Sequence, residues 1–334
     1  MSDETLNISL DDAEALISAA MRSCGVSSTA AMSVARALVA AEAEGQNGHG
    51  FSRVNDYVAQ VRSGKINAHA EPKVIPDAPS AIRIDADYGF AYPALDIAFE
   101  TIVPLARFQG VASAAVFQSH HCGALSVQVA RLAEEGLVGM MVANAPASMA
   151  PWGGKKPIFG TNPIAFSAPR ESGSPLVIDL SLSKVARGKV MHARKTGTEI
   201  PDGWALDREG NATTDPVAAL DGTMLPIGEA KGTALALMVE ILASVMTGAN
   251  FSTDAGSFFT ADGSKPNTGQ FLIAFDPQNR AEFIGRIEQL LQSIEKMEGA
   301  RLPGSRRAQS IQHSKTNGIM VPKLYLDAAR AMAA

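Results

Sequence analysis

Residues 111–143 decide the fold class, and they read VASAAVFQSHHCGALSVQVARLAEEGLVGMMVA. Residues 111–117 form an apolar run typical of a buried strand, and residues 137–143 form a second such run. Between them, residues 123–136 place apolar side chains at helical spacing. A strand, an amphipathic helix and a second strand in succession predict an α/β or mixed α+β enzyme.

The chain before this stretch is predicted to be mainly helical. Ser9 and Asp12 form a capping pair at the start of the first apolar periodic segment. Residues 81–87 alternate between apolar and polar side chains, as a strand does. Helices are predicted over residues 9–25, 28–45, about 52–62 and 92–110.

Beyond residue 143 the pattern becomes mixed. Residues 150–169 contain glycine and proline at the frequency of a loop, and residues 200–216 form a long polar loop. Strands are predicted over 176–182 and 270–276, and helices over 184–197, 231–248 and 281–298. In the helix over 231–248, five apolar residues fall on one stripe: Leu235, Met238, Ile241, Leu242 and Val245.

The amino-acid composition limits the classes of function that the chain can have. The 334 residues are 46% hydrophobic and 19% charged, with a net charge of −5, which gives no basic surface for nucleic acid. The most apolar segment carries Glu240 and does not predict a membrane span. Two cysteines without metal-type spacing, and an acidic N-terminus without a signal pattern, predict a cytoplasmic protein with reduced thiols and no bound metal.

The usual dinucleotide-binding signature is missing from the sequence. No G-x-G-x-x-G stands at a predicted strand-to-helix turn, and the Walker pattern is absent as well. A Rossmann domain is therefore not expected, and a nicotinamide site must be built in another way. Two interleaved lobes are expected, with residues 1–120 and 301–334 in one and residues 121–300 in the other.

The segment EGQNGHGFSRV, residues 44–54, places His49 between Gly48 and Gly50. Imidazole titrates near neutral pH and can exchange a proton with a substrate. Arg53 lies four residues further on, and its guanidinium can grip a carboxylate with two hydrogen bonds. A plainer interpretation, a turn histidine bonding a carbonyl beside an arginine on a solvated helix face, is favoured by the local pattern alone.

The segment SHHCGAL, residues 119–125, lies between a predicted strand and a predicted helix. Free N–H groups at the helix start can bind a phosphate, and Gly123 permits its close approach. His120 and His121 lack partners at metal-ligand spacing, so a metal site is not favoured; a capping or core role stays open.

Further candidates lie in other loops. Thr161 belongs to the turn GTNP, and Asp179 ends a predicted strand, where it can hold a ribose hydroxyl or cap the helix that follows. Lys231 stands at a helix start, where a bound anion would offset its charge. The segment RLPGSRR, residues 301–307, combines a Gly-Ser turn with three arginines and suits a phosphate or salt bridges to the neighbouring acidic helix.

Taken together, these segments resemble the malate/L-lactate dehydrogenase type 2 family over essentially the whole chain. The stretches that carry the resemblance are GHGFSR, SHHCGA, APWGG, FGTNPIAF, VIDLSLSKVARGK, IPDGWALD, TTDP, KGTALALMVE and RLPGSRR, in the same order. Within the family, GFSRV, GFAYPALD, LSLSKVARGK and GSRR look most like the Δ1-piperideine-2-carboxylate/Δ1-pyrroline-2-carboxylate reductase branch.

The resemblance implies a non-Rossmann fold with a mixed, largely antiparallel sheet flanked by helices. It implies NADPH-dependent reduction of a cyclic ketimine acid, with NADH possible, in a homodimer without nucleic-acid or membrane partners. An NAD(P)-dependent 2-hydroxyacid dehydrogenase acting on a keto acid is the alternative, and a non-catalytic NADP-binding protein is a third interpretation.

The resemblance also implies roles for individual residues. His49 matches the proton donor, and some relatives give that role to the position of His121. Substrate contacts are implied for Arg53, Thr161, Arg187 and Gly188. Cofactor contacts are implied for His121, Cys122, Gly123, Ala124, Leu125, Asp179, Leu180, Ser181, Lys231, Gly304, Ser305, Arg306, Arg307, Ala308, Gln309 and Ser310.

Two positions depart from the family pattern. Gly48 stands where the family usually has a serine that relays charge to the histidine. Either Asn47 or a water takes over from that hydroxyl, or His49 is held less firmly. Cys122 replaces what is commonly a phenylalanine, which is expected to alter packing near the nicotinamide.

Overall fold

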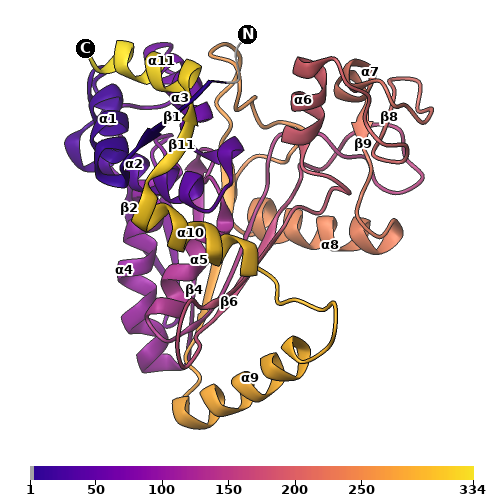
Figure 1. Cartoon of the computed structure of the whole chain (residues 1–334). Coiled ribbons are helices and arrows are strands. Elements are labelled where there is room, and N and C mark those ends of the chain that lie inside the picture. Colours follow the sequence, from indigo (N-terminus) through magenta and orange to yellow (C-terminus); the bar gives the residue numbers. More distant parts are fainter. Residues whose placement is uncertain (1–3) are drawn as a thin grey trace.

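The computed structural model describes residues 4–334, and its centre is a seven-stranded sheet (Figure 1). In spatial order the strands are β2 (Lys73–Ala78), β3 (Ala81–Asp85), β4 (Val111–Ser119), β10 (Thr268–Phe275), β5 (Val138–Ala143), β6 (Ile164–Ala168) and β7 (Leu176–Leu180). Only β3 and β4 pair in parallel; every other neighbouring pair in this sheet is antiparallel. This confirms the predicted mixed α/β class and its largely antiparallel sheet.

Helices cover both faces of the sheet, which explains why its central strands are apolar throughout. On one face, α4 (Ala91–Gln109) and α5 (Leu125–Glu134) pack against Ala114 and Val116 of β4. On the other face, α8 (Ala230–Glu240) and the π-helical turn Ile241–Val245 share a core with Ala115.

The N-terminal helices form a layer beside this sheet. The helices are α1 (Leu10–Arg22), α2 (Ser28–Ala43) and α3 (Val54–Arg62), joined in one core by the C-terminal helix α11 (Lys323–Ala333). Ser9 caps α1 as predicted, because its hydroxyl accepts a hydrogen bond from the Asp12 N–H at 3.1 Å. The two chain ends also pair as strands, β1 (Thr5–Ile8) with β11 (Ile319–Pro322).

The C-terminal segment therefore returns to the N-terminal helices, as the expected interleaving requires. The central sheet, however, runs without interruption across residue 120, since β4 pairs with β10. The proposed division into lobes at residue 120 stays a prediction.

The remaining elements surround this frame. A peripheral group contains α6 (Arg187–Thr196), α7 (Pro216–Asp221) and the short pair β8 (Ala205–Leu206) and β9 (Thr223–Met224). Helix α9 (Arg280–Glu295) follows β10, and α10 (Ser305–Asn317) leads back toward the N-terminal layer (Figure 1).

Three sequence-based expectations were wrong in detail. Residues 150–169, expected as a loop, contain β6, a short strand among glycines and prolines. The polar loop over 200–216 contains β8. The fully exposed edge strand β2 was not predicted at all, because without a buried face it shows no apolar alternation.

Most of the apolar stripe noted in the helix over 231–248 is exposed, although Leu242 packs against the core. Leu235, Met238, Ile241 and Val245 of the predicted stripe are 42%, 37%, 44% and 57% exposed. The buried apolar side of α8 and of the π-helical turn that follows it is formed by Ala236, Val239 and Ala243. Within residues 4–334, no helix is long and apolar enough to cross a membrane.

Candidate active site

A small cavity of about 60 Å³ lies where the ends of β4 and β5 meet the turn that precedes β6. His49, His121 and Thr161, three residues predicted from the sequence, line it together with Cys122 and Gly123. Side chains that the sequence motifs did not single out also line it: Asn144, Phe258 and Gln270. The structure therefore brings both predicted proton-transfer candidates to one small space.

The two glycines beside His49 serve different purposes. A Cβ at Gly50 would overlap the buried carboxylate of Glu42, which accepts a hydrogen bond from the Phe51 N–H at 2.8 Å. At Gly48, nothing lies within 4 Å of the position that a Cβ would take. Only Gly48 therefore leaves free space next to His49, whereas Gly50 makes room for a carboxylate of the protein itself.

His49 has no orienting partner. Its Nδ1 is buried without a hydrogen bond to any described residue, and its ring lies against that of His121 with centroids 5.2 Å apart. Loss of solvent around the ring, and then the charge of Arg53, lower the pKa of His49 to about 4. At neutral pH this imidazole is uncharged.

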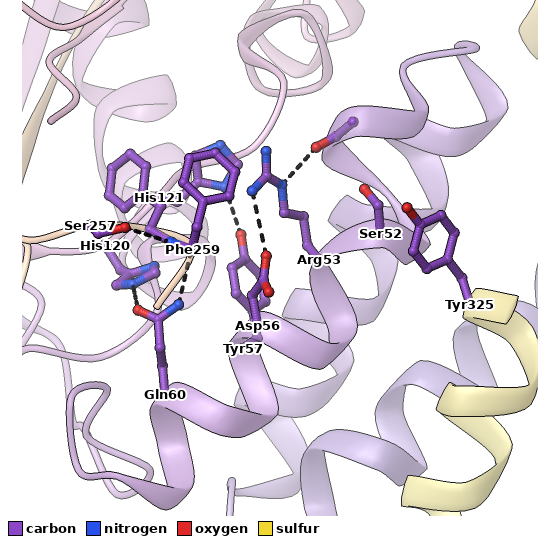
Figure 2. Close-up of polar contacts among 12 residues, drawn as sticks. Ser52, Arg53, Asp56, Tyr57, Gln60, His120, His121, Ser257, Phe259 and Tyr325 are labelled. Atoms are coloured by element: carbon purple, nitrogen blue, oxygen red, sulfur yellow. Dashed lines mark hydrogen bonds and ion pairs between the residues drawn. The ribbon is translucent and has the colours of Figure 1, made fainter. Parts of the chain in front are cut away.

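Arg53 follows His49 on a 3₁₀ turn (Phe51–Arg53) that leads into α3. Its Nε donates to the Gly48 carbonyl at 2.7 Å, and its guanidinium lies 4.5 Å from the ring centroid of Phe259. The carboxylate of Asp56 is 3.7 Å away (Figure 2). Arg53 is thus held in place at the site while part of its fork remains free to bind an anion.

His121 is held by a chain of two phenols. Its Nδ1 lies 2.7 Å from the Tyr57 hydroxyl (Figure 2). That hydroxyl in turn lies 2.9 Å from the hydroxyl of Tyr92. Burial, then the charge of Arg53, hold the pKa of His121 well below its usual range. Because Nδ1 is occupied, Nε2 is the ring nitrogen left to face the cavity.

His120, the other member of the histidine pair, has a different environment. Its Nε2 lies 2.9 Å from Gln60 Oε1, and burial lowers its pKa to about 3. The amide orientation of Gln60 is set because its Nε2 donates to the Phe258 carbonyl at 2.9 Å. His120 is therefore a neutral, structural histidine.

The wall that carries Phe258 and Phe259 is tied to the end of α3. The buried ammonium of Lys65 donates to three carbonyls of this loop, those of Ser257, Thr260 and Asp262, at 2.8, 3.0 and 2.9 Å. The loop is thus held close to the C-terminal end of α3, the helix that carries Tyr57 and begins directly after Arg53.

The turn that carries Thr161 is tied to α8. The next residue, Asn162, is fully buried with a positive φ of 39°, and its amide donates to the Glu240 carboxylate at 2.8 Å. The same carboxylate accepts from the N–H and hydroxyl of Ser252 at 2.6 and 2.7 Å. Glu240, which interrupted the apolar run, therefore joins two loops at the cavity.

Two helix starts predicted to bind the cofactor meet beside β7. The Asp179 carboxylate accepts from the Ser126 N–H in the first turn of α5 at 2.9 Å. Gly304, with φ +79°, precedes α10, and the Arg307 guanidinium donates to the Val177 carbonyl at 3.0 Å. Burial raises the pKa of Asp179. Asp179 therefore caps α5, and not the helix that follows it in the sequence.

These contacts separate the arginines of the RLPGSRR segment. Arg307 is turned inward and bonded to β7, whereas Arg306 is exposed at the start of α10. Ser310, one turn further on, bonds the Ala43 carbonyl at 2.8 Å. Arg306 and Ser305 are therefore better placed than Arg307 to meet a phosphate.

Of the remaining predicted residues, only Leu125 belongs to the described cavity lining. Arg187 and Gly188 begin α6, in a segment joined to Thr161 through the hydrogen bond from Leu182 N to the Thr161 carbonyl. Lys231 is exposed in the first turn of α8. Ala124 is the N-cap of α5 and Leu125 its first residue, Leu180 ends β7 and Ser181 follows it, and Ala308 and Gln309 lie in α10.

Sequence reasoning missed Tyr57, Gln60 and Tyr92. Tyr57 follows Arg53 by four residues and Gln60 follows Tyr57 by three. This spacing predicts that Arg53, Tyr57 and Gln60 lie on one face of a helix. That spacing was available as a signal. In the described part of the chain, no group of three His, Cys, Asp or Glu residues could hold a metal ion.

The comparisons with known proteins agree with this geometry. The family model for malate/L-lactate dehydrogenase matches residues 8–328. The chain belongs to the malate/L-lactate dehydrogenase family. As a member of this family it is an oxidoreductase, and the cavity lies where several of the motifs that carry the resemblance meet.

Relatives within the malate/L-lactate dehydrogenase family have different names. A (2R)-3-sulfolactate dehydrogenase (NADP(+)) from Chromohalobacter salexigens is 50% identical over 98% of both chains. A Δ1-pyrroline-2-carboxylate/Δ1-piperideine-2-carboxylate reductase from Pseudomonas aeruginosa is 39% identical, over 95% of this chain and 96% of that one. The crystal structure of Δ1-piperideine-2-carboxylate reductase from Pseudomonas syringae pv. tomato matches with a TM-score of 0.93 at 37% identity, covering 98% of this chain and 100% of that one.

Proposed function

We propose that the chain is an NADPH-dependent oxidoreductase that interconverts a 2-oxo acid and its 2-hydroxy acid, and that 3-sulfolactate and its 2-oxo counterpart are its preferred pair. The supporting observation is a second cationic group besides Arg53. Arg187 is partly buried, and among residues 4–334 no carboxylate forms an ion pair with it. Burial and then the neighbouring Arg194 lower its pKa.

A partly buried guanidinium that has no ion-pair partner within the described chain favours binding an anion from outside it. Helix α6 adds to the positive field, since its ten residues include four lysines and arginines and no acid. A 3-sulfo acid carries a carboxylate and a sulfonate, so it can use Arg53 and Arg187 at once. The relative at 50% identity, a 3-sulfolactate dehydrogenase, supports the same choice.

The described residues fit NADPH. The starts of α5 and α10 offer N–H groups beside Asp179, and Gly304 leaves no room for a side chain because a Cβ there would meet the Val177 carbonyl. We propose that Ser305 and Arg306 hold the 2′-phosphate. When bound, NADPH supplies the hydride. Arg53 and Thr161 then hold the substrate carboxylate, and a histidine of the cavity exchanges the proton.

Reduction of a cyclic ketimine carboxylate is the second candidate. It is supported by the reductases at 39% identity and by the structural match to Δ1-piperideine-2-carboxylate reductase. A protonated imine carries a positive charge, which the basic α6 disfavours. For that reason the oxo acid with two anionic groups comes first.

We also propose a homodimer. The exposed apolar stripe of α8, formed by Leu235, Met238, Ile241 and Val245, is the kind of surface that a second copy of the chain would cover. Because the other side of α8 holds Asn162 through Glu240, such contact would lie directly behind the turn that carries Thr161.

The test is NADPH oxidation by purified protein with 3-sulfopyruvate, pyruvate and Δ1-piperideine-2-carboxylate in parallel, each repeated with NADH. We expect the highest kcat/KM with 3-sulfopyruvate and NADPH. Arg187→Met should remove the preference over pyruvate, while Lys189→Met, an exposed cation on the same helix, should retain it. A higher kcat/KM with Δ1-piperideine-2-carboxylate would select the second candidate.

A further inference from the structure

One wall of the active-site cavity carries Gln270, a side chain of β10 for which the steps above give no use. Gln270 is fully buried and lines the cavity. Its Nε2 donates to the His120 carbonyl at 3.2 Å, so the orientation of the amide is set and Oε1 is its free end. That oxygen is buried without a partner among the described residues. A buried amide oxygen without a hydrogen bond costs free energy, so a partner from outside the chain is expected.

The ring of His120 supplies a second acceptor to the same cavity. Its Nε2 lies 2.9 Å from Gln60 Oε1 (Figure 2), and Gln60 uses its own Nε2 for the Phe258 carbonyl. Because Gln60 Oε1 can only accept, the proton of the neutral His120 ring is on Nε2, and Nδ1 carries a lone pair. Nδ1 is buried and has no partner in the described part of the chain. Besides its structural bond to Gln60, His120 therefore has one open acceptor.

Other polar groups of the cavity differ from these two. The amide of Asn144 is used at both ends, since Oδ1 accepts from the Gly269 N–H at 2.9 Å and Nδ2 donates to the Asn250 carbonyl at 2.8 Å. His49 Nδ1 also lacks a partner within residues 4–334, but no neighbour fixes its proton, so it can donate as well as accept. Gln270 Oε1 and His120 Nδ1 can only accept.

Two acceptors determine which ligand group can occupy this part of the cavity. A carboxylate or sulfonate only accepts hydrogen bonds, so both anionic groups of the substrate are excluded here and directed toward Arg53 and Arg187. The carbonyl of a 2-oxo acid accepts as well, and a 2-hydroxyl or an imine N–H brings a single hydrogen. A primary amide carries two hydrogens on one nitrogen and matches both acceptors.

We propose that Gln270 Oε1 and His120 Nδ1 accept the two hydrogens of a primary carboxamide, that of the nicotinamide ring of NADPH. This inference rests on the proposed function, which assigns the 2′-phosphate, and with it the adenine end, to the start of α10. Cys122, Gly123 and Leu125 line the cavity and lead directly into α5, the second helix start of the cofactor site. The nicotinamide end is therefore the one that reaches the cavity.

This pair of acceptors has a purpose in the reaction. The carboxamide is attached to the ring carbon next to the one that carries the hydride. By holding the carboxamide, Gln270 and His120 select which face of the ring is turned toward the substrate. Without the cofactor, the cavity of about 60 Å³ has room for about two water molecules, which can serve the same acceptors.

The first experiment changes the ligand and leaves the protein intact. In 3-acetylpyridine adenine dinucleotide phosphate, a methyl group replaces the carboxamide NH₂, so both hydrogens are lost while the phosphates are retained. In isothermal titration calorimetry, the native protein should bind NADP⁺ about 10- to 100-fold more tightly than this analogue, because the analogue leaves two buried acceptors unpaired. Equal affinities would overturn the inference.

The second experiment removes one acceptor. Gln270→Met keeps the length of the side chain, and the His120 carbonyl still has a donor in the Thr268 hydroxyl at 3.2 Å. This variant should bind NADP⁺ about 5- to 20-fold more weakly and the analogue nearly as the native protein does. Gln128→Met, the same change at a buried glutamine outside the cavity lining, should keep the full preference.

Two results with Gln270→Met would contradict the inference. An undiminished preference for NADP⁺ would show that the amide oxygen does not accept from the cofactor. Weaker binding of 3-sulfolactate with unchanged binding of NADP⁺ would assign Gln270 to the substrate.

A third measurement follows His120 in protein with the native Gln270. The six histidines are labelled with ¹⁵N, and His120 Nδ1 is assigned through His120→Gln. Its signal should move when NADP⁺ is added and much less when the analogue is added; equal shifts would show that the amide hydrogens do not reach this nitrogen. If NADP⁺ is preferred as expected but no acid of the panel is turned over, the proposed function fails and the inference stands. Turnover without that preference has the opposite meaning.

Discussion

The imidazole rings of His49 and His121 lie face to face, with an angle of 15° between their planes and 5.2 Å between their centroids. A charge on one ring opposes a charge on the other, and both are close to Arg53. The site therefore keeps both histidines neutral near pH 7, and this has consequences for the stability of the protein.

The stability of the native state should depend on His49 at acidic pH. Because its pKa is lowered from 6.5 to about 4, the unfolded chain binds more protons in this interval, and the free energy of unfolding rises with pH. The slope from this group is at most about 1.4 kcal/mol per pH unit. Urea unfolding at several pH values should show a smaller slope for His49→Gln than for the native protein. The exposed His313→Gln is the control; an unchanged slope in His49→Gln would contradict the prediction.

Glu42 should act with the opposite sign. Burial raises its pKa from 4.5 to about 7, so the native state binds the proton more tightly and stability falls as pH rises through this interval. Glu42→Gln keeps an oxygen for the Phe51 N–H but cannot ionise. Relative to the native protein, this variant should gain about 3 kcal/mol in the free energy of unfolding between pH 4 and pH 8. A constant difference across pH would show that Glu42 titrates normally.

The glycines at 48 and 50 should respond differently to the same substitution. Gly50→Ala places a Cβ against the Glu42 carboxylate and should lower the free energy of unfolding by about 1–3 kcal/mol. Gly48→Ala meets nothing within 4 Å and should leave it nearly unchanged. Thermal melts of both variants decide the matter, and equal losses would mean that the turn, not the carboxylate, sets the requirement for glycine. Gly48→Ser, which supplies the serine usual in the family, should also fold normally.

The apolar stripe of α8 should be buried in solution. Ile241→Lys places a charge at its centre and should shift the protein from dimer to monomer in analytical ultracentrifugation. Leu290→Lys makes the same change at an exposed apolar residue of α9, so it is the matched control and should leave the dimer intact. A native protein that sediments as a monomer would exclude this use of the stripe.

The extent to which the sequence predicted the fold depended on which faces are buried. Residues 111–143 were predicted correctly as strand, helix and strand because β4 and β5 are buried on both faces and α5 on one. Strand β2 is exposed throughout and carries no such pattern. The helix predicted over 231–248 is confirmed over most of its length, but the spacing of its apolar residues did not show that most of the stripe is exposed while Ala236, Val239 and Ala243 are buried.

The candidate site was predictable where a motif is local and not where contacts come from distant parts of the chain. His49, His121 and Thr161 were expected at one site through the family resemblance, and the structure places them around one cavity. The purpose of Gly50 could not be read from the sequence, since Glu42 reaches it from the preceding helix. The role of Lys65 depends on a loop about two hundred residues further along, which no local pattern indicates.

The ammonium of Lys65 takes the position in the loop around Phe258 and Phe259 that a bound metal ion could otherwise fill. Carbonyl oxygens that converge on one positive centre are also found where loops bind a hard cation such as Ca²⁺. Here the positive centre is covalently part of the chain. The loop that carries Phe258 and Phe259 should therefore keep its shape when divalent cations are removed with a chelator.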